Sequence, residues 1–399
     1  MNKLTSKHIM LVISMCGVIG VVLGFCSNVT GVFFTPIAEE FGIGKGSVSL
    51  TLTICSLVMA FTGMISSKVI NRNNFRKMLM IMLGTIAAST AALAFCTNIM
   101  MMYVFQALRG AACGIIGLVM VTPIINHWFC KSNGLFTSIC VGFSGLTGAV
   151  FSPVMTSIIQ SAGWRAGYLA CAAVIVVFSL PAVFFPIAMY PEDAGTQCYG
   201  IRPEEASSGS KKESSGVPAA MFLLTACYAA LACYGTAMPQ HFPGIAESFS
   251  LSASIGALMV STAMVCNTGG KVLLGILIDA IGCRLSCLLF LAGVTAGGLC
   301  MLMIHNTAGM FLGAALIGLS YSLGSVGTAL VVKDVFGEEK YSSVYPKVAL
   351  FTTLSNSLAT SLIGVLYDSS GTYNSGLLSV SVFAAVSIGL LIICYRKKA

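Results

Sequence analysis

Long apolar runs separated by short polar clusters follow one another along the whole chain. Each run is about as long as the 20 residues that an α-helix needs to cross roughly 30 Å of hydrocarbon. The pattern therefore predicts twelve membrane-spanning helices joined by short loops. The predicted helices cover residues 9–34, 48–68, 78–97, 99–125, 134–159, 167–190, 218–242, 252–279, 285–304, 308–332, 345–367 and 376–395.

The longest polar segment lies near the middle of the chain, at residues 191–217. Its run Ser207-Ser208-Gly209-Ser210-Lys211-Lys212 has the composition of a flexible linker. We expect a cytoplasmic linker here, between an N-terminal half of six helices at 1–190 and a C-terminal half of six helices at 218–399.

Short sequence matches at one constant offset indicate that the two halves are repeats. Three pairs of segments are separated by 208 positions, which points to a parallel duplication. Transporters built from such repeats place the substrate site where the repeats meet, near the middle of the membrane. The pairs are Ile37–Phe41 with Ile245–Phe249, Ala107–Gly110 with Ala315–Gly318, and Ser161–Gly163 with Ser369–Gly371.

Composition and charge support a membrane protein. The apolar fraction is 57%, the charged fraction is 9% and the mean hydropathy is +0.93, which excludes a water-soluble globular domain. With a cytoplasmic N-terminus, about 17 Lys and Arg fall on the cytoplasmic side, and only Lys45 and Arg165 lie outside. The positive-inside rule then predicts cytoplasmic N- and C-termini, and the short loops suggest a bacterial inner (cytoplasmic) membrane. No clustered basic face suits nucleic acid.

The loop after the eighth predicted helix carries the most specific motif. Gly275-x3-Asp279-x2-Gly282-x-Arg284 resembles the G-x3-D-x2-G-x-R signature of major facilitator proteins. The resemblance implies an all-α fold of two pseudo-symmetric six-helix bundles. It also implies a gating motif in which Asp279 and Arg284 form charge-assisted bonds when the substrate site faces outward. The alternative is a plain interface loop. The first-half segment Gly63–Arg72 has Ser67 and Ile70 where the signature has Asp and Gly.

Two basic residues lie inside predicted spans. Lys271 stands two turns before Asp279, where a lysine costs about 2.5 to 3.5 kcal/mol, so we expect a substrate role rather than snorkelling to the interface. Arg109 lies about eleven residues into the fourth span and resembles the R-x-x-x-G pattern of that span. It either contacts an anion or satisfies carbonyl groups of neighbouring helices, and the sequence leaves both roles open.

Further patches resemble the monocarboxylate and oxalate/formate branch of the family, namely Gly31–Gly42, Gly163-Trp164-Arg165 and Pro191–Gly195. Monocarboxylate transporters carry D-x3-R-x3-G in the eighth span, where this chain has Asn267-x3-Lys271-x3-Gly275. The resemblance implies that Lys271 binds a carboxylate. Asn28 aligns with a first-span lysine of that branch, so Asn28 and Asn267 would be neutral hydrogen-bonding partners.

These residues restrict the mechanism, because no Asp or Glu lies deep in a predicted span. Anion exchange follows if only the loaded carrier crosses, whereas proton symport follows if Lys271 loses its proton when empty. His241 is interpreted as an interfacial residue, with a pH-sensitive gate as the alternative. Tyr321 is nominated as a pathway residue, although aromatic side chains are more often packing elements.

The sequence thus predicts a secondary transporter for a small organic anion, a monocarboxylate being favoured, that works as a monomer by alternating access. No enzyme constellation, cofactor motif or metal-ligand cluster is evident, and the 16 cysteines lie mostly in apolar runs. Proton-coupled drug or metabolite efflux is the alternative, although Gly142-x2-Gly145-x2-Gly148-x4-Pro153 lacks the adjacent Gly-Pro of the usual antiporter signature. A membrane sensor is a third reading, which the short chain ends disfavour.

Overall fold

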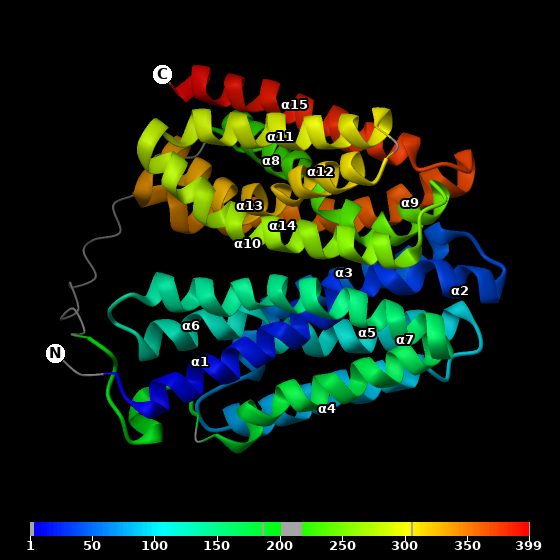
Figure 1. The fold of residues 1–399 in the computed structure, drawn as a ribbon. Helices are drawn as coiled ribbons and strands as arrows, with labels where there is room; N and C mark the ends of the chain where they lie inside the picture. The colour runs from blue at the N-terminus through cyan, green and yellow to red at the C-terminus, as the bar shows by residue number, and fades with distance from the viewer. Residues whose placement is uncertain (1–3, 186, 201–217, 305, 399) are drawn as a thin grey trace. The chain divides into compact units, whose positions relative to one another are not determined.

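The computed structural model describes residues 4–185, 187–200, 218–304 and 306–398 (Figure 1). Within these residues every named secondary-structure element is a helix. The only β-structure among them is one isolated bridge between Phe129 and Tyr199. The predicted all-α membrane fold is confirmed.

The described residues of the first half form seven α-helices, with one π-helix and two 3-10 helices beside them. The elements are α1 (Ser6–Ile19), the π-helix η1 (Gly20–Asn28), the 3-10 helix η2 (Thr30–Phe33), α2 (Phe34–Phe41), α3 (Lys45–Val69), α4 (Phe75–Leu93), α5 (Ile99–Ile116), α6 (Leu118–Trp128), α7 (Asn133–Phe184) and the 3-10 helix η3 (Pro191–Ala194).

The described residues of the second half form eight α-helices, one 3-10 helix and one π-helix. The elements are α8 (Ala219–Tyr234), the 3-10 helix η4 (Gly235–His241), α9 (Phe242–Ser248), α10 (Ala253–Ile281), α11 (Cys283–Met303), α12 (Thr307–Gly318), α13 (Ser320–Ser322), the π-helix η5 (Leu323–Gly327), α14 (Thr328–Ser370) and α15 (Asn374–Lys398).

Eleven continuous helical segments of the described chain are long and apolar enough to cross a bilayer. The longest, α7, has 52 residues and would extend about 78 Å if it were straight, more than twice the thickness of the hydrocarbon core. Gly163 interrupts it with φ 82° and ψ 165°, a conformation that glycine adopts without steric cost. Divided at Gly163, these segments give the twelve spans that the hydrophobic pattern predicts.

The first span is longer than predicted, running from Ser6 to Phe41 rather than from 9 to 34. The polar pair Glu39-Glu40 marks an end by hydropathy, but the chain stays helical through α2. Pro36 lies in the first turn of α2, where a missing backbone N–H costs no hydrogen bond. Gly42 then ends the helix in the left-handed conformation, with φ 61°.

The structure repeats at the same offset of 208 positions as the sequence. Helices α3, α4 and α5 begin at Lys45, Phe75 and Ile99, and α10, α11 and α12 begin 208 positions later in each case. The Asn98 side chain accepts the backbone N–H of Met101 as an N-cap, and Asn306 does the same for Gly309. The duplication therefore preserves these helix starts and this pair of asparagine caps as well as sequence.

Close helix contacts repeat in the same way. A β-carbon on Gly110 would lie 2.2 Å from the carbonyl oxygen of Cys55, and one on Gly318 would lie 2.6 Å from that of Ala263. These two pairs are also 208 positions apart. In both repeats, a glycine lets the backbones of the second and fourth spans come into direct contact.

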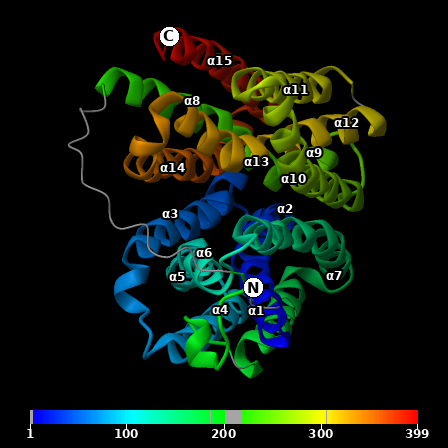
Figure 2. The same cartoon turned by 90° about the vertical axis from the view of Figure 1, so that its left-hand side faces the viewer.

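Backbone contacts divide the chain into two units, Met1–Thr30 with Ile54–Ser210 and Gly31–Thr53 with Lys211–Ala399. In the first unit α1 packs on α7, and α4 packs against α5 and α7 (Figure 2). In the second unit α15 lies against α11 and α8, and α14 packs on α8. Residues 201–217 of the predicted linker lie outside the described residues, and the predicted halves at 1–190 and 218–399 remain a prediction.

Candidate functional site

Arg109 lies in α5 of the first unit and is buried, with 2% of its surface exposed. Its Nη2 donates a hydrogen bond to the carbonyl oxygen of Cys26, at 3.3 Å. Cys26 belongs to the π-helix η1, whose wider winding is common at functional sites. Within the described chain, the Nε of Arg109 has no hydrogen-bond partner. This geometry matches the role of a buried guanidinium that satisfies a carbonyl group of a neighbouring helix.

Asn28 ends the same π-helix, and its Nδ2 donates to the carbonyl oxygen of Ser144 in α7 at 3.0 Å. Gln106, one turn before Arg109, is fully buried, and neither its amide nitrogen nor its oxygen has a partner among the described residues. Sequence reasoning missed Gln106, although an amide three residues before a buried arginine in an apolar span was a readable signal. The polar centre of the first unit thus comprises Asn28, Gln106 and Arg109.

Lys271 lies in α10 of the second unit and is half-buried. Among the described residues its ammonium forms no hydrogen bond or ion pair. Asn267, one turn earlier on the same helix, is 3% exposed, and its Oδ1 also has no partner in the described chain. Residues four apart share a helix face, so an unneutralised cation and an unsatisfied amide lie next to each other.

Tyr321 belongs to α13, which packs against α10 in the same unit. It is half-buried and pairs with the side chain of Gln240. The Oε1 of Gln240 also accepts the backbone N–H of Gly31, at 2.9 Å. The Oγ of the neighbouring Ser322 donates to the backbone oxygen of Asn267, at 3.4 Å. The structure therefore brings Asn267, Lys271 and Tyr321 onto adjoining elements of one unit, while Asn28 and Arg109 belong to the other.

His241 is not the interfacial residue that the sequence suggested. It is 1% exposed and its Nε2 donates to the carbonyl oxygen of Thr360, at 2.9 Å. The rings of Phe34 and Tyr373 lie 5.6 and 5.8 Å from the imidazole, measured between ring centroids. The chain continues as helix α9 for about two turns after His241, so His241 lies inside the helical segment and not at its end. The polar residues and prolines around His241 made the sequence resemble the end of a span.

The gating motif lies where α10 ends and α11 begins. Gly282 joins the two helices with φ 84°, which requires glycine. Asp279 and Arg284 are exposed and form no ion pair with each other in the described chain. The Arg284 guanidinium instead lies 5.9 Å from the Tyr395 ring centroid, and the Tyr395 hydroxyl donates to Asp334 Oδ2 at 2.6 Å. Asp334 was missed because it lies 50 residues from the motif.

The first-half counterpart of this motif, Gly63–Arg72, lies at the end of α3. The ends of α3 and α10, Val69 and Ile281, are 212 positions apart, because α10 is four residues longer than α3. Gly63 and Gly275 are separated by the same 212 positions, so the two segments stay in register at the helix ends. In this loop Arg72 forms a bidentate ion pair with Asp193, which holds the pKa of that carboxyl below its ordinary value.

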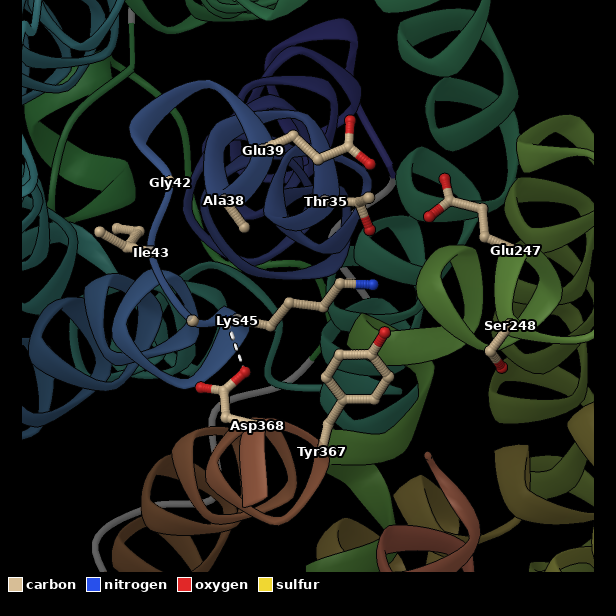
Figure 3. Close-up of a pocket in the computed structure, with 11 residues that line it drawn as sticks. Thr35, Ala38, Glu39, Gly42, Ile43, Lys45, Glu247, Ser248, Tyr367 and Asp368 are labelled. Atoms are coloured by element: carbon tan, nitrogen blue, oxygen red, sulfur yellow. Dashed lines mark hydrogen bonds between the residues drawn. The ribbon is translucent and has the colours of Figure 1, made fainter. Parts of the chain in front are cut away.

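A pocket of about 470 Å³ in the second unit is lined by residues of α2, the start of α3, the end of α9 and the last turns of α14 (Figure 3). The Lys45 side chain extends into it between Thr35 and Tyr367, and its Nζ lies 4.5 Å from the Tyr367 ring centroid. Glu39 and Glu247 also line the pocket. Sequence analysis placed Lys45 on the outer side but could not pair it, because its neighbours come from segments 200 and more than 300 residues away.

Two repeats of six spans, with interrupted helices and buried polar groups in each, define a polytopic membrane protein of the transporter type. The model of the Major Facilitator Superfamily matches residues 16–240 and 220–399, so the chain belongs to that superfamily. The prediction made from the loop motif and the repeat is confirmed.

Curated relatives match shorter parts of the chain. Human monocarboxylate transporter 7 is 24% identical over 137 residues, which are 34% of this chain and 26% of that protein. The uncharacterized transporter YcxA of Bacillus subtilis is 25% identical over 158 residues, which are 38% of each chain. The matches therefore span well under half the length of these relatives.

Solved structures match over nearly the whole chain. A bacterial homologue of the human lysosomal transporter Spinster, crystallised in an inward-facing and occupied conformation, superposes with a TM-score of 0.73 over 99% of this chain and 98% of that one. Its inward-facing, unoccupied form gives a TM-score of 0.74. At 12% and 13% sequence identity, these likenesses show the fold alone.

Proposed function

We propose that this transporter moves a small organic anion, a monocarboxylate foremost, by alternating access, with Lys271 as the anchor for the carboxylate. The observation that carries the proposal is the half-buried ammonium of Lys271, which no described residue neutralises. A cation in an apolar span is costly, and a bound carboxylate lowers that cost.

Neighbouring groups suit a carboxylate ligand. Asn267 lies one turn from Lys271, and the two N–H donors of its side-chain amide can serve the second carboxylate oxygen. Tyr321, on the adjoining element, presents a hydroxyl beside Gln240. Asn28 and Arg109 are proposed as further polar groups of the pathway. The likeness to monocarboxylate transporter 7 over a third of the chain supports the same substrate class.

We also propose that the protein acts as a monomer in a bacterial inner membrane with both termini cytoplasmic. Excess Lys and Arg in the loops on that side support this orientation. Energy would come from a proton or a counter-transported anion. A bound anion that neutralises Lys271 permits exchange, and loss of the Lys271 proton in the empty carrier permits symport.

Uptake of radiolabelled lactate, pyruvate, formate and oxalate into proteoliposomes tests the proposal. We expect Lys271→Ala to lower uptake of a monocarboxylate by about 10- to 100-fold, the loss that removing one charge-assisted bond produces. Lys271→Arg should retain part of the activity because the charge remains. Lys77→Ala, which removes an exposed lysine at the start of α4, is the matched control and should transport normally.

The same vesicles separate the coupling modes. Stimulation by an internal anion indicates exchange, whereas stimulation by an inward proton gradient indicates symport. If the folded protein transports none of the acids, or if Lys271→Ala transports them as well as wild type does, the carboxylate assignment is wrong. Uptake or efflux of an organic cation would then favour the drug-efflux alternative, since Lys271 repels a cation.

A further inference from the structure

The first turn of α3 lacks the local cap that its repeat has. Helix α10, which begins 208 positions after α3, follows Ser252, whose side chain accepts the backbone N–H of Ile255 at 3.4 Å. The residue before α3 is Gly44, which has no side chain to accept such a bond. The first backbone N–H groups of a helix need an acceptor, so α3 requires one from elsewhere.

Asp368, at the far end of the chain in the last turn of α14, provides that acceptor (Figure 3). Its Oδ1 accepts the backbone N–H of Lys45 at 2.8 Å, and its Oδ2 accepts that of Gly46 at 2.7 Å. A β-carbon on Gly44 would lie 2.2 Å from Oδ2, so the missing side chain also makes room for the carboxylate. The negative charge suits the positive end of the helix dipole.

The contact between α3 and α14 continues inward from this cap. A β-carbon on Gly364 would lie 2.7 Å from the Cα of Gly46, so the two backbones approach closely. Further along, the Oγ1 of Thr53 donates to the carbonyl oxygen of Ser357 at 2.6 Å. After Thr53, α3 leaves the second unit and continues as part of the first. One helix thus belongs to both units, and its first turns are held by α14.

We propose that Asp368 is the latch of an external gate, which caps α3 in place of a local residue and thereby holds Lys45–Thr53 on α14. In the proposed orientation this contact lies at the external end, because Arg284 and Tyr395 mark the cytoplasmic end of the same unit. Opening toward the outside then requires that both bonds of Asp368 break. The inference goes beyond the proposed function and does not depend on which substrate is carried.

A cysteine introduced into the buried contact between α3 and α14, called the reporter, measures gate opening in the absence of substrate. Ser357 is 2% exposed and its hydroxyl donates to the carbonyl oxygen of Thr353 in its own helix, so Ser357→Cys changes little in the closed state. It lies about 16 Å along α14 from Asp368. A membrane-impermeant maleimide added outside right-side-out vesicles reaches this thiol only when α3 separates from α14, and the parent without the reporter gives the background of the 16 native cysteines.

The critical variant combines Asp368→Ala with Gly44→Ser. The serine supplies the local cap that Ser252 gives α10, so α3 keeps a capped start while the bond to α14 is removed. We expect labelling of the reporter to become about fivefold faster or more, as expected from losing a charge-assisted hydrogen bond at a partly exposed site. Asp368→Asn, which keeps one acceptor without the charge, should give an intermediate rate. Ser369→Ala, which removes a hydroxyl bonded within its own helix, should not change it.

Unchanged labelling in the double variant and in Asp368→Asn, in protein of normal thermal stability, would show that Asp368 is only a helix cap and would overturn the latch. Faster labelling from the cytoplasmic side alone, in inside-out vesicles, would also overturn the external gate. Because labelling needs no transported acid, failure of the carboxylate assignment leaves this result interpretable, and failure of the latch leaves the uptake experiment unaffected.

Discussion

The two basic residues inside the apolar spans, Arg109 and Lys271, have opposite environments. Arg109 is 2% exposed and bonds to a carbonyl group of a π-helix, whereas Lys271 is half-buried and bonds to no described residue. Neither has a counterpart in the other repeat, since the equivalent positions hold Ile317 and Gly63. The duplication preserved the backbone contacts of Gly110 and Gly318 and the caps of Asn98 and Asn306, while the chemistry of other side chains diverged.

The difference separates a cation that is bonded to a carbonyl group from one that no described residue neutralises. A guanidinium stays charged and can satisfy several carbonyl groups, which suits a buried structural role. An ammonium is a compact point charge whose burial without an anion is costly. The first unit would therefore depend on its cation for stability, and the second would use its cation for binding.

The largest expected effect contrasts the two cations in thermal unfolding. Arg109→Ala should destabilise the protein by about 2 to 4 kcal/mol, because it leaves a cavity and an unpaired carbonyl group. Lys271→Ala should leave the stability unchanged or raise it, since no described partner is lost and an ammonium buried without an anion is costly. Unfolding of both variants in the same detergent checks this. Equal destabilisation by the two substitutions would remove the distinction.

A smaller effect tests whether the repeated glycine contacts are equivalent. Gly110→Ala and Gly318→Ala each place a methyl group against a backbone carbonyl and should cost about 1 to 3 kcal/mol, with Gly110 the more costly. Gly269→Ala, at an exposed helical position where a β-carbon meets nothing within 4 Å, is the control and should be neutral or slightly stabilising. Tolerance of Gly110→Ala would show that the second and fourth spans can separate without cost.

The repeated caps should give the next smaller effect. Asn98→Ala and Asn306→Ala each remove one N-cap bond, and each should lower the free energy of unfolding by about 1 kcal/mol. Replacement by Asp or Ser should restore most of the loss. Markedly different costs at the two positions would mean that the caps have diverged in the way the cations have.

The smallest effect concerns the exposed ion pair of Arg72 and Asp193, which lies outside the spans of the first repeat. Arg72 lowers the folded-state pKa of the Asp193 carboxyl, so the stabilising contribution is present above the ordinary pKa of 3.8 and is lost as pH falls through the lowered value. Arg72→Gln should abolish this part of the pH dependence. A stability profile between pH 2 and 6, at low and high salt, measures it, and an unchanged profile would show that the pair contributes nothing.

Much of the fold was predictable because its signals are local. Hydrophobic runs of bilayer length located the spans, and matches at one offset revealed the repeat whose helix starts the structure reproduces. Gly163 and Gly282 lie in the predicted breaks between spans, and the structure gives both a backbone conformation that favours glycine. The extra turn of α10 relative to α3 agrees with the predicted ranges, since the eighth predicted span, 252–279, is longer than the second, 48–68. The predicted site residues keep the status of predictions, now with their surroundings known.

By itself, the sequence determined the all-α membrane class, the superfamily and the presence of cations in apolar spans, because length and hydropathy are properties of neighbouring residues. Only the tertiary structure decided what each cation meets: a carbonyl group for Arg109, no described partner for Lys271, and the ring of Tyr367 for Lys45. It also decided that Asp368 caps a helix more than 300 residues earlier in the chain. Such pairings depend on how the spans pack. A local sequence pattern does not show which distant side chain will accept a given hydrogen bond.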